Sequence, residues 1–423
     1  MDHFQYRNGI LHAEDVAIPA IAAAVGTPFY CYSTATMTRH YQVLADSLEG
    51  TEARICYAVK ANSNQSVIRT MIELGAGADV ISGGELRRAL AAGASPDSIV
   101  FAGPGKTRDE LIQALAAGIY QFNVESEPEL RLLSAVATDM GKVAPVSIRV
   151  NPDVDAGTHE KITTGRKQNK FGIPIARTME VFELGATLPG LDLLGIAIHI
   201  GSQITDLAPF EEAFDRALKL VDELRLAGYD IRRCNLGGGL GIPYAGETPP
   251  SPAEYGRMVK RLTANRQLDL ALEPGRVLVG NAGILVARVI YEKNEGRRFI
   301  IIDAAMNDLI RPAMYDSWHD IVPVAEAGPG APISEADVVG PICESGDTLA
   351  KARPLPSLAP DDLIAVRGAG AYGAVMASTY NSRALIPEVL VRGDQFAVIR
   401  PRQSIDDLLA LDRPAPWLSP TLE

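Results

Sequence analysis

The stretch RICYAVKANSN, residues 54–64, combines a short buried strand with a lysine at its end. Apolar residues run from Ile55 to Val59, and Lys60 then leads into a polar segment. One interpretation is a solvated strand end, because lysine is almost never fully buried unless it is paired. The other is an amine in a low-dielectric pocket, where desolvation lowers its pKa until the free amine can add to a carbonyl. The rest of the chain decides between these two.

From about residue 54 onward, short strand-like runs alternate with amphipathic helical patterns. The helical stretches, such as RDELIQALAAG at 108–118, carry apolar residues at i, i+3, i+4 and i+7 and mostly end in glycine. Eight such units, each near thirty residues, predict an α/β fold with a (β/α)8 TIM-like barrel rather than a doubly wound open sheet. The predicted strands are Ile55–Val59, Ala78–Ile81, Ile99–Ala102, Tyr120–Val124, Val146–Val150, Leu194–Ile200, Arg233–Leu236 and Leu270–Leu272.

The pattern changes at about Gly280. Strand-like runs such as RRFIIIDA and QFAVIRP are then separated by turns rich in glycine and proline. We therefore expect a barrel over residues 37–279 and a C-terminal antiparallel β domain, resembling a β-sandwich or β-barrel, over 280–423. Residues 1–36, with the run PFYCYS, are expected to join this second domain.

Composition excludes several classes of function. The chain has 423 residues, 47% of them hydrophobic and 22% charged, as in a globular protein, and its net charge of -12 argues against a nucleic-acid partner. The four cysteines show no zinc-site spacing, so no metal is expected, and their scatter suggests a reducing compartment. We find neither a signal peptide nor an apolar run long enough to cross a membrane, and we expect a cytoplasmic protein.

Two glycine-rich stretches differ in what they indicate about phosphate binding. GPGKT at 103–107 resembles the end of a P-loop, but that pattern needs glycine where Val100 stands. GGGLG at 237–241 follows the seventh predicted strand, where backbone N–H groups without Cβ atoms around them can approach a phosphate. The alternative for this second stretch is a tight turn alone.

Polar residues gather where the predicted strands end, which is where barrel enzymes place their chemistry. A phosphate site beside a strand-end lysine points to pyridoxal phosphate (PLP), which offers an aldehyde to an amine and a phosphate to N–H groups. Glu273 is the candidate acid for the ring nitrogen, and His199 either stacks on the ring or is an ordinary core residue. The strand-end residues are Lys60, Asp79, Ser82, Arg149, Asn151, His199, Ser202, Gly237–Gly239 and Glu273–Arg276.

Six ordered motifs give the chain a specific resemblance. It is similar to the PLP-dependent decarboxylases of the alanine-racemase-like fold and, within them, most resembles the diaminopimelate decarboxylases. The similarity covers essentially the whole chain and includes NKFGI at 169–173. The motifs are YAVKAN at 57–62, HIGSQ at 199–203, GGGLG at 237–241, EPGR at 273–276, CESGD at 343–347 and GAYG at 370–373.

The resemblance implies a role for each matching residue. Lys60 would bind PLP covalently, His199 would stack on the ring, and Cys343 would be the acid that reprotonates the carbanion. Glu273 would pair with the ring nitrogen, and Asp79, Glu85 and Arg149 would support the Lys60 end. Cofactor binding would involve Lys60, Asp79, His199, Ser202, Gly239, Glu273, Gly275, Arg276 and Tyr372. Substrate binding would involve Arg276, Arg311, Tyr315, Glu344 and Tyr372.

The charge pattern of these residues fits a substrate with two carboxylates and two amines. Cations at one end and an anion at the other would be needed, and Arg276 and Arg311 with Glu344 supply them. The alternatives are a surface ion pair for Arg311 and an inert buried thiol for Cys343.

The resemblance therefore implies PLP-dependent decarboxylation of meso-2,6-diaminoheptanedioate to L-lysine and CO2. It also implies a homodimer in which Cys343 and Glu344 complete the partner's site. The alternatives are a sibling decarboxylase for ornithine, arginine or carboxynorspermidine, a racemase, or a PLP-binding protein without catalysis. Glu273 weighs against a racemase, which usually has arginine facing the ring nitrogen. One departure lies in the loop 157–168, where Glu160 stands in place of a frequent proline.

Overall fold

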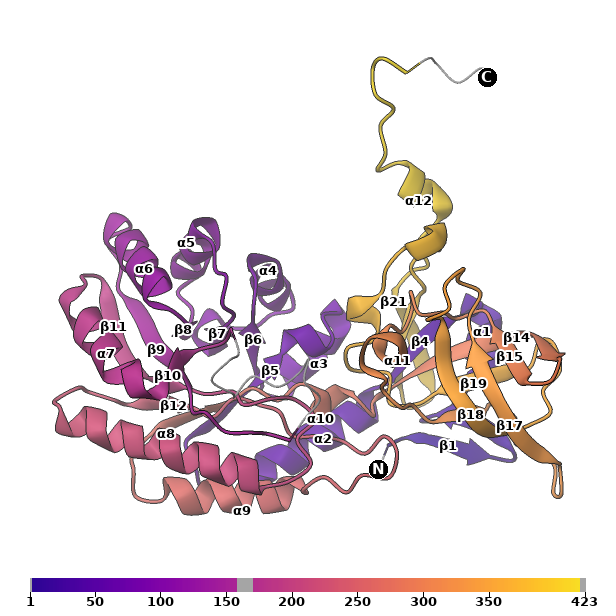
Figure 1. The fold of residues 1–423 in the computed structure, drawn as a ribbon, viewed down its shortest axis with the longest axis horizontal. Helices are drawn as coiled ribbons and strands as arrows, with labels where there is room; N and C mark the ends of the chain where they lie inside the picture. Colours follow the sequence, from indigo (N-terminus) through magenta and orange to yellow (C-terminus); the bar gives the residue numbers. More distant parts are fainter. Residues whose placement is uncertain (1, 158–169, 419–423) are drawn as a thin grey trace. The chain divides into compact units, whose positions relative to one another are not determined.

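The computed structural model describes residues 2–157 and 170–418, and the chain forms two compact units (Figure 1). The first unit contains Thr34–Ala282 and Gly370–Val375. The second contains His3–Ser33, Gly283–Ala369 and the chain from Met376 onward. Each unit has its own sheet, so each is described by itself.

Eight parallel strands close into a barrel in the first unit, which confirms the predicted (β/α)8 fold (Figure 1). The order is β9-β11-β12-β13-β5-β6-β7-β8, and β8 then pairs with β9, with Phe122 opposite Val146. An open doubly wound sheet would lack this last pairing. The strands are β5 (Ala53–Ala58), β6 (Gly77–Val80), β7 (Ile99–Phe101), β8 (Gln121–Val124), β9 (Ala144–Asn151), β11 (Leu191–Ala197), β12 (Arg233–Asn235) and β13 (Asp269–Leu272), with β10 (Ile173–Pro174) beside β9.

Helices alternate with the barrel strands, as the apolar periodicity predicts. Several begin at the caps their sequences offer: the Thr107 side chain accepts a hydrogen bond from the Glu110 N–H, and Ser251 caps its helix in the same way. No helix in the described ranges is long and apolar enough to cross a membrane. The helices of this unit are α2 (Thr34–Ser47), α3 (Gln65–Glu73), α4 (Gly83–Ala91), α5 (Arg108–Ala117), α6 (Glu127–Asp139), α7 (Thr178–Thr187), α8 (Ala208–Leu226), α9 (Pro252–Thr263) and α10 (Arg276–Val279).

Five of the predicted strands end one to three residues earlier than the sequence suggests, and two of these ends lead into predicted site residues. The predicted first strand reaches Val59, but β5 stops at Ala58 and residues Val59–Ala61 form a 3-10 turn. The carbonyl of Ala61 accepts a hydrogen bond from the N–H of Tyr372 at 2.8 Å, outside the barrel ladder. The sixth strand, predicted to reach Ile200, ends at Ala197 because its neighbour β12 ends at Asn235. Lys60 and His199 therefore lie on the turns that leave the strands.

The second unit is built on a sheet whose pairings are mostly antiparallel, which agrees with the predicted β domain. Parallel pairs occur between β15 and β17 and between β4 and β20, where β4 is the PFYCYS segment. A core of buried aliphatic and aromatic side chains, including Phe29 and Val286, packs against this sheet. Its strands are β4 (Phe29–Ser33), β14 (Gly283–Asn294), β15 (Arg298–Ile302), β16 (Ile321–Pro323), β17 (Ile333–Val339), β18 (Thr348–Pro356), β19 (Leu363–Val366), β20 (Glu388–Arg392) and β21 (Gln395–Arg400). The remaining elements are β1 (Phe4–Arg7), β2 (Ile10–Ala13), β3 (Val16–Ala17), α1 (Ile18–Val25), α11 (Arg311–Tyr315) and α12 (Ile405–Leu409).

Lys106, from the GPGKT stretch, is a buried ammonium in the barrel wall. Its Nζ donates hydrogen bonds to the carbonyls of Gly103 at 2.8 Å and Asn123 at 2.7 Å. A third bond of 2.7 Å reaches Glu129 Oε1, and the Lys106 side chain is 0% exposed. All three of its N–H groups are satisfied, so this lysine holds the end of β8 to α6 and has a structural role.

We expect Lys106→Met to destabilise the protein by about 3–5 kcal/mol at pH 7.5, because the substitution leaves the buried Glu129 carboxylate without its cationic partner. Burial raises the pKa of Glu129, and the Lys106 charge counteracts that effect. The loss should therefore shrink as the pH falls and Glu129 takes up a proton. Urea unfolding from pH 5 to 8 measures this loss of stability. The control is Arg108→Met, which removes one partner of an exposed ion pair with Asp139. Equal losses in the two variants would contradict this assignment.

Candidate active site

Lys60 lies at the carboxyl end of β5 with its Nζ 3.1 Å from Asp79 Oδ2. The Lys60 side chain is 30% exposed, whereas the Asp79 side chain is fully buried. Burial lowers the pKa of the Lys60 ammonium, but the charge of Asp79, followed by Tyr372 and Glu273, outweighs it and raises that pKa above its ordinary value. The expectation of a pKa lowered by desolvation is therefore wrong for the cofactor-free protein, because Asp79, expected only to support the Lys60 end, is its direct ionic partner.

Glu273, at the end of β13, is a buried carboxylate held by two amides. Asn235 Nδ2 donates to Glu273 Oε1 at 2.6 Å, and Asn123 Nδ2 donates to the same oxygen at 3.0 Å. Burial, assisted by the Asp79 charge, raises the pKa of Glu273 to about 7, although Lys60 and the Asn235 hydrogen bond counteract this. A cation placed beside Glu273 would therefore meet a carboxyl group that can gain or lose a proton near neutral pH.

His199 follows β11 and faces the same end of the barrel. Its Nδ1 accepts a hydrogen bond from the N–H of Gly238 at 3.2 Å. Burial, together with the charges of Lys60 and Arg149, lowers the pKa of His199 well below its ordinary value. The imidazole is therefore neutral, with its proton on Nε2, and suits stacking on a flat ring better than ion pairing.

The glycine run after β12 is required by close packing of neighbouring strand ends. A Cβ on Gly238 would lie 2.1 Å from the Glu273 carbonyl oxygen, and one on Gly239 would lie 2.4 Å from that of Gly201. Gly239 has a φ of +108°, which disfavours other residues. Within the described ranges, the N–H groups of Gly239 and Gly275 donate to no other residue. They form a cradle in which backbone donors remain available to an anion.

Arg276 begins α10 beside this cradle and is nearly buried. Its Nη2 donates to Ser202 Oγ at 3.1 Å, and its Nη1 donates to the Tyr244 hydroxyl at 2.9 Å. The guanidinium carbon lies 4.8 Å from the centre of the Tyr372 ring. A guanidinium, two phenols and a serine hydroxyl thus border the cradle, a set that suits phosphate and carboxylate groups.

Comparisons with known proteins agree with this geometry. A family model described as "Pyridoxal-dependent decarboxylase, pyridoxal binding domain" matches residues 34–280. The diaminopimelate decarboxylase of Pseudomonas fluorescens is 52% identical over 412 residues, covering 97% of this chain and 98% of the relative. That of Vibrio cholerae is 49% identical and covers 98% of this chain and 100% of the relative. The chain belongs to the diaminopimelate decarboxylase family.

Solved structures of the diaminopimelate decarboxylase family share the fold. One from Helicobacter pylori, complexed with L-lysine, has a TM-score of 0.90 and 40% identity and covers 93% of this chain and 98% of that chain. One from M. jannaschii has a TM-score of 0.93 and 34% identity and covers 98% of both chains. The expected family, fold and cofactor class are confirmed.

The residues of the first unit fit the PLP of the diaminopimelate decarboxylase family. An amine is available at Lys60, a buried acid at Glu273 and a neutral imidazole at His199. The glycine cradle leaves the backbone donors of Gly239 and Gly275 available beside the Ser202 hydroxyl. Asp79 Oδ1 is buried without a hydrogen-bond partner among the described residues, so this oxygen can accept a hydrogen bond from a bound group.

The other predicted residues of this diaminopimelate decarboxylase family member lie in the second unit. Arg311 is buried, and its Nη1 donates to His319 Nε2 at 2.9 Å, so it is not part of a surface ion pair. Tyr315 ends α11. Cys343 is exposed, unlike the three other cysteines, which are buried. The Tyr380 hydroxyl donates to Glu344 Oε2 at 3.0 Å.

The structure thus brings one group of predicted residues together at the carboxyl ends of the barrel strands and places Arg311, Tyr315, Cys343 and Glu344 in the second unit. Glu85 accepts a hydrogen bond from the Ile81 N–H, and Arg149 pairs with Glu125 at 2.7 Å. Glu160 and the rest of the loop 157–168, apart from Gly157, lie outside the described residues. The barrel group is Lys60, Asp79, His199, Ser202, Gly239, Glu273, Gly275, Arg276 and Tyr372.

Sequence reasoning missed the residues that hold this group in place. Asn123 and Asn235 contact Glu273, Tyr244 contacts Arg276, and Glu125 contacts Arg149. A signal existed for the two asparagines, because both are polar residues inside predicted buried strands. For Tyr244, in the long loop after the glycine run, we find no such signal.

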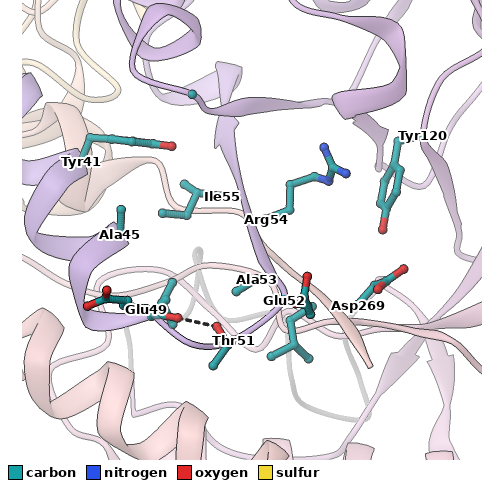
Figure 2. A pocket seen from close by; sticks show the side chains of 13 residues that line it. Tyr41, Ala45, Glu49, Thr51, Glu52, Ala53, Arg54, Ile55, Tyr120 and Asp269 are labelled. Carbon is teal, nitrogen blue, oxygen red and sulfur yellow. Dashed lines mark hydrogen bonds between the residues drawn. The ribbon is translucent and has the colours of Figure 1, made fainter. Parts of the chain in front are cut away.

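A cavity of about 500 Å³ lies at the opposite, amino-terminal ends of β5 and β13 (Figure 2). Arg54 and Tyr120 line it, with the guanidinium carbon 4.5 Å from the ring centre, together with Glu52 and Asp269. None of the predicted site residues lines this cavity. In barrels of this kind the amino-terminal face contributes mainly to stability, so we place the site at the other end.

We expect Asp79→Asn to lower the pKa of Lys60, because the change removes the charge that opposes desolvation and keeps the side-chain shape. In the cofactor-free protein, the pH profile of Lys60 labelling by trinitrobenzenesulfonate should move to lower pH by about 1–3 pH units. Peptide mapping measures it. Lys219, in an exposed pair with Asp215, is the internal control and should label alike in both proteins. An unmoved Lys60 profile would refute the pairing.

Proposed function

We propose that this chain decarboxylates meso-2,6-diaminoheptanedioate to L-lysine and CO2 with PLP as its cofactor. The observation that supports this proposal is the group of residues at one end of the barrel. It consists of the amine of Lys60, the Glu273 carboxylate with its two amide donors, and the glycine cradle beside Arg276. The Helicobacter pylori relative complexed with L-lysine, the product of this reaction, supports the choice of substrate.

Each barrel residue has a role in this proposal. PLP, when bound, supplies an electron sink for the carbanion that forms as CO2 leaves. Lys60 would hold it covalently, and His199 would lie against its ring. Glu273 would pair with the ring nitrogen and favour its protonated form. Ser202, Gly239, Gly275, Arg276 and Tyr372 would hold the phosphate, with Asp79 next to Lys60.

The second unit selects the substrate in this proposal. Arg311, held in place by His319, and Tyr315 bind the distal carboxylate, while Glu344 binds the distal ammonium. Arg276 and Tyr372 of the first unit bind substrate as well. Cys343 Sγ delivers the proton that replaces the carboxylate. A substrate without a second carboxylate, such as ornithine, would leave the Arg311 guanidinium without its anion.

We further propose a cytoplasmic homodimer in which Cys343 and Glu344 complete the partner's site. Both residues lie on a loop stabilised by Asp347, whose Oδ2 accepts a hydrogen bond from the Ile342 N–H at 2.7 Å. Cys343 and Glu344 are exposed in the single chain, as residues offered to a partner must be. None of the four cysteines forms a disulfide, which is typical of proteins from a reducing compartment.

The domain division also belongs to this proposal. Residues 37–279 would form the PLP-binding domain, and residues 1–36 and 280–423 the domain that contributes substrate contacts. The segment Gly370–Val375, which carries Tyr372, groups with the barrel although its neighbours in sequence do not. In this proposal the segment therefore supplies the Tyr372 hydroxyl to the phosphate site of the barrel.

The product formed from each stereoisomer tests the proposed function. We expect L-lysine and CO2 from the meso substrate and little product from the LL isomer, ornithine or arginine. Lys60→Ala should lose nearly all turnover, because no amine remains to bind PLP covalently. Faster CO2 release from ornithine or arginine would favour a sibling enzyme, and no turnover of any amino acid by protein that binds PLP would favour a non-catalytic role.

Mixing two inactive variants tests the shared site. Lys60→Ala and Cys343→Ala subunits, unfolded together and refolded, should regain about a quarter of wild-type activity, because half of randomly assorted dimers contain one intact site. Cys343→Ala alone should lose kcat while keeping PLP affinity. Each variant refolded by itself is the control. If the mixture stays inactive although hybrid dimers form, Cys343 acts within its own subunit.

A further inference from the structure

Two buried amides converge on one oxygen of Glu273. Asn123 comes from β8 and Asn235 from β12, and both donate to Oε1, at 3.0 and 2.6 Å. Asn123 is 2% exposed and Asn235 is 1% exposed, so water does not compete for these bonds. Within the described ranges, no hydrogen bond engages the other oxygen, Oε2.

The contact of its own oxygen determines which way the Asn235 amide points, and Asn123 has a matching contact with Gln121. Asn235 Oδ1 accepts a hydrogen bond from the backbone N–H of Gly237 at 2.9 Å, and that N–H can only donate. The Nδ2 group of Asn235 must therefore face Glu273. Asn123 Oδ1 is occupied in turn by the Nε2 group of Gln121 at 2.7 Å.

We propose that Asn123 and Asn235 are positioning residues that favour the ionised form of Glu273 and turn its Oε2 toward the ring nitrogen of PLP. This inference rests on the proposed function only in taking PLP as the ligand and Glu273 as its partner. Two donors on one oxygen favour the carboxylate over the carboxylic acid, because hydrogen bonds to the charged form are the stronger ones. They also leave the second oxygen as the acceptor for the cofactor.

Each asparagine is anchored to another part of the site. The carbonyl of Asn123 accepts a bond from the buried Lys106 Nζ, which holds the end of β8. Asn235 bonds through Gly237 to the start of the glycine cradle. The orientation of Glu273 is thereby coupled to the backbone that would hold the phosphate.

Asparagine-to-aspartate variants test the donor role with almost no change of shape. Asn235→Asp retains an acceptor for the Gly237 N–H, and Asn123→Asp retains one for Gln121, but each places an anion against Glu273. We expect about tenfold weaker PLP binding at pH 8 in each variant, as for the loss of a hydrogen bond to a charged group. This loss of PLP affinity should become smaller toward pH 6, where a protonated aspartate can again donate a hydrogen bond to Glu273.

PLP affinity is measured by absorbance titration of the cofactor-free protein, so this readout does not depend on turnover or on the amino acid decarboxylated. Ser134→Ala is the matched control, because Ser134 is a buried donor in α6 whose hydroxyl bonds to the Pro189 carbonyl. It should leave PLP binding unchanged. In both aspartate variants we expect kcat to fall more than KM rises, because ring protonation matters most in the reaction step.

A double-mutant cycle with Glu273→Gln separates positioning from structure. When residue 273 is neutral, Asn235→Asp and Asn123→Asp should weaken PLP binding less than about twofold. The same loss in both backgrounds would overturn the inference. If one aspartate variant fails to fold, the double-mutant cycle on the other asparagine still tests the inference. If the cycle shows coupling but diaminoheptanedioate yields no lysine, the proposed substrate is wrong and the inference stands.

Discussion

The pairing of β8 with β9 is the constraint on which the rest of the site depends. It closes the sheet, so that residues from distant strands converge at one end of the barrel. Asn123 of β8 can then contact Glu273 of β13, 150 positions later in the chain. In an open sheet, β8 and β9 would be free to diverge and the two amides would not meet one carboxylate. Barrel closure therefore brings both amides to one oxygen of Glu273, a carboxyl group whose pKa is raised chiefly by burial.

The barrel contains several buried charges, and each is held by an opposite charge or by amide donors. Lys60 pairs with Asp79, Arg149 with Glu125, and Lys106 with Glu129. Breaking any such pair would leave a charge with little access to water, at a cost of several kcal/mol. Asp79 raises the pKa of Lys60, so Lys60 would have to lose a proton before its amine could add to an aldehyde.

Much of the fold could be predicted because its signals are local. Most of the eight strands are short apolar runs, the helices have the period of amphipathic helices, and caps such as Thr107 mark where helices begin. The site was predictable to the extent that strand ends in a barrel are known to meet. Lys60, His199, Gly239 and Glu273 could be singled out on that ground. Their partners could not, because a polar residue within a strand does not reveal which strand it faces.

The sequence by itself determined the barrel, the residues at its strand ends and the family, since these depend on composition, periodicity and ordered motifs. Only the tertiary structure decided the electrostatics. The direction of the Lys60 pKa depends on a contact with Asp79 across two strands, and the structural role of Lys106 depends on three partners from separate segments. Charge interactions follow distance and burial, and neither quantity is a local property of the chain.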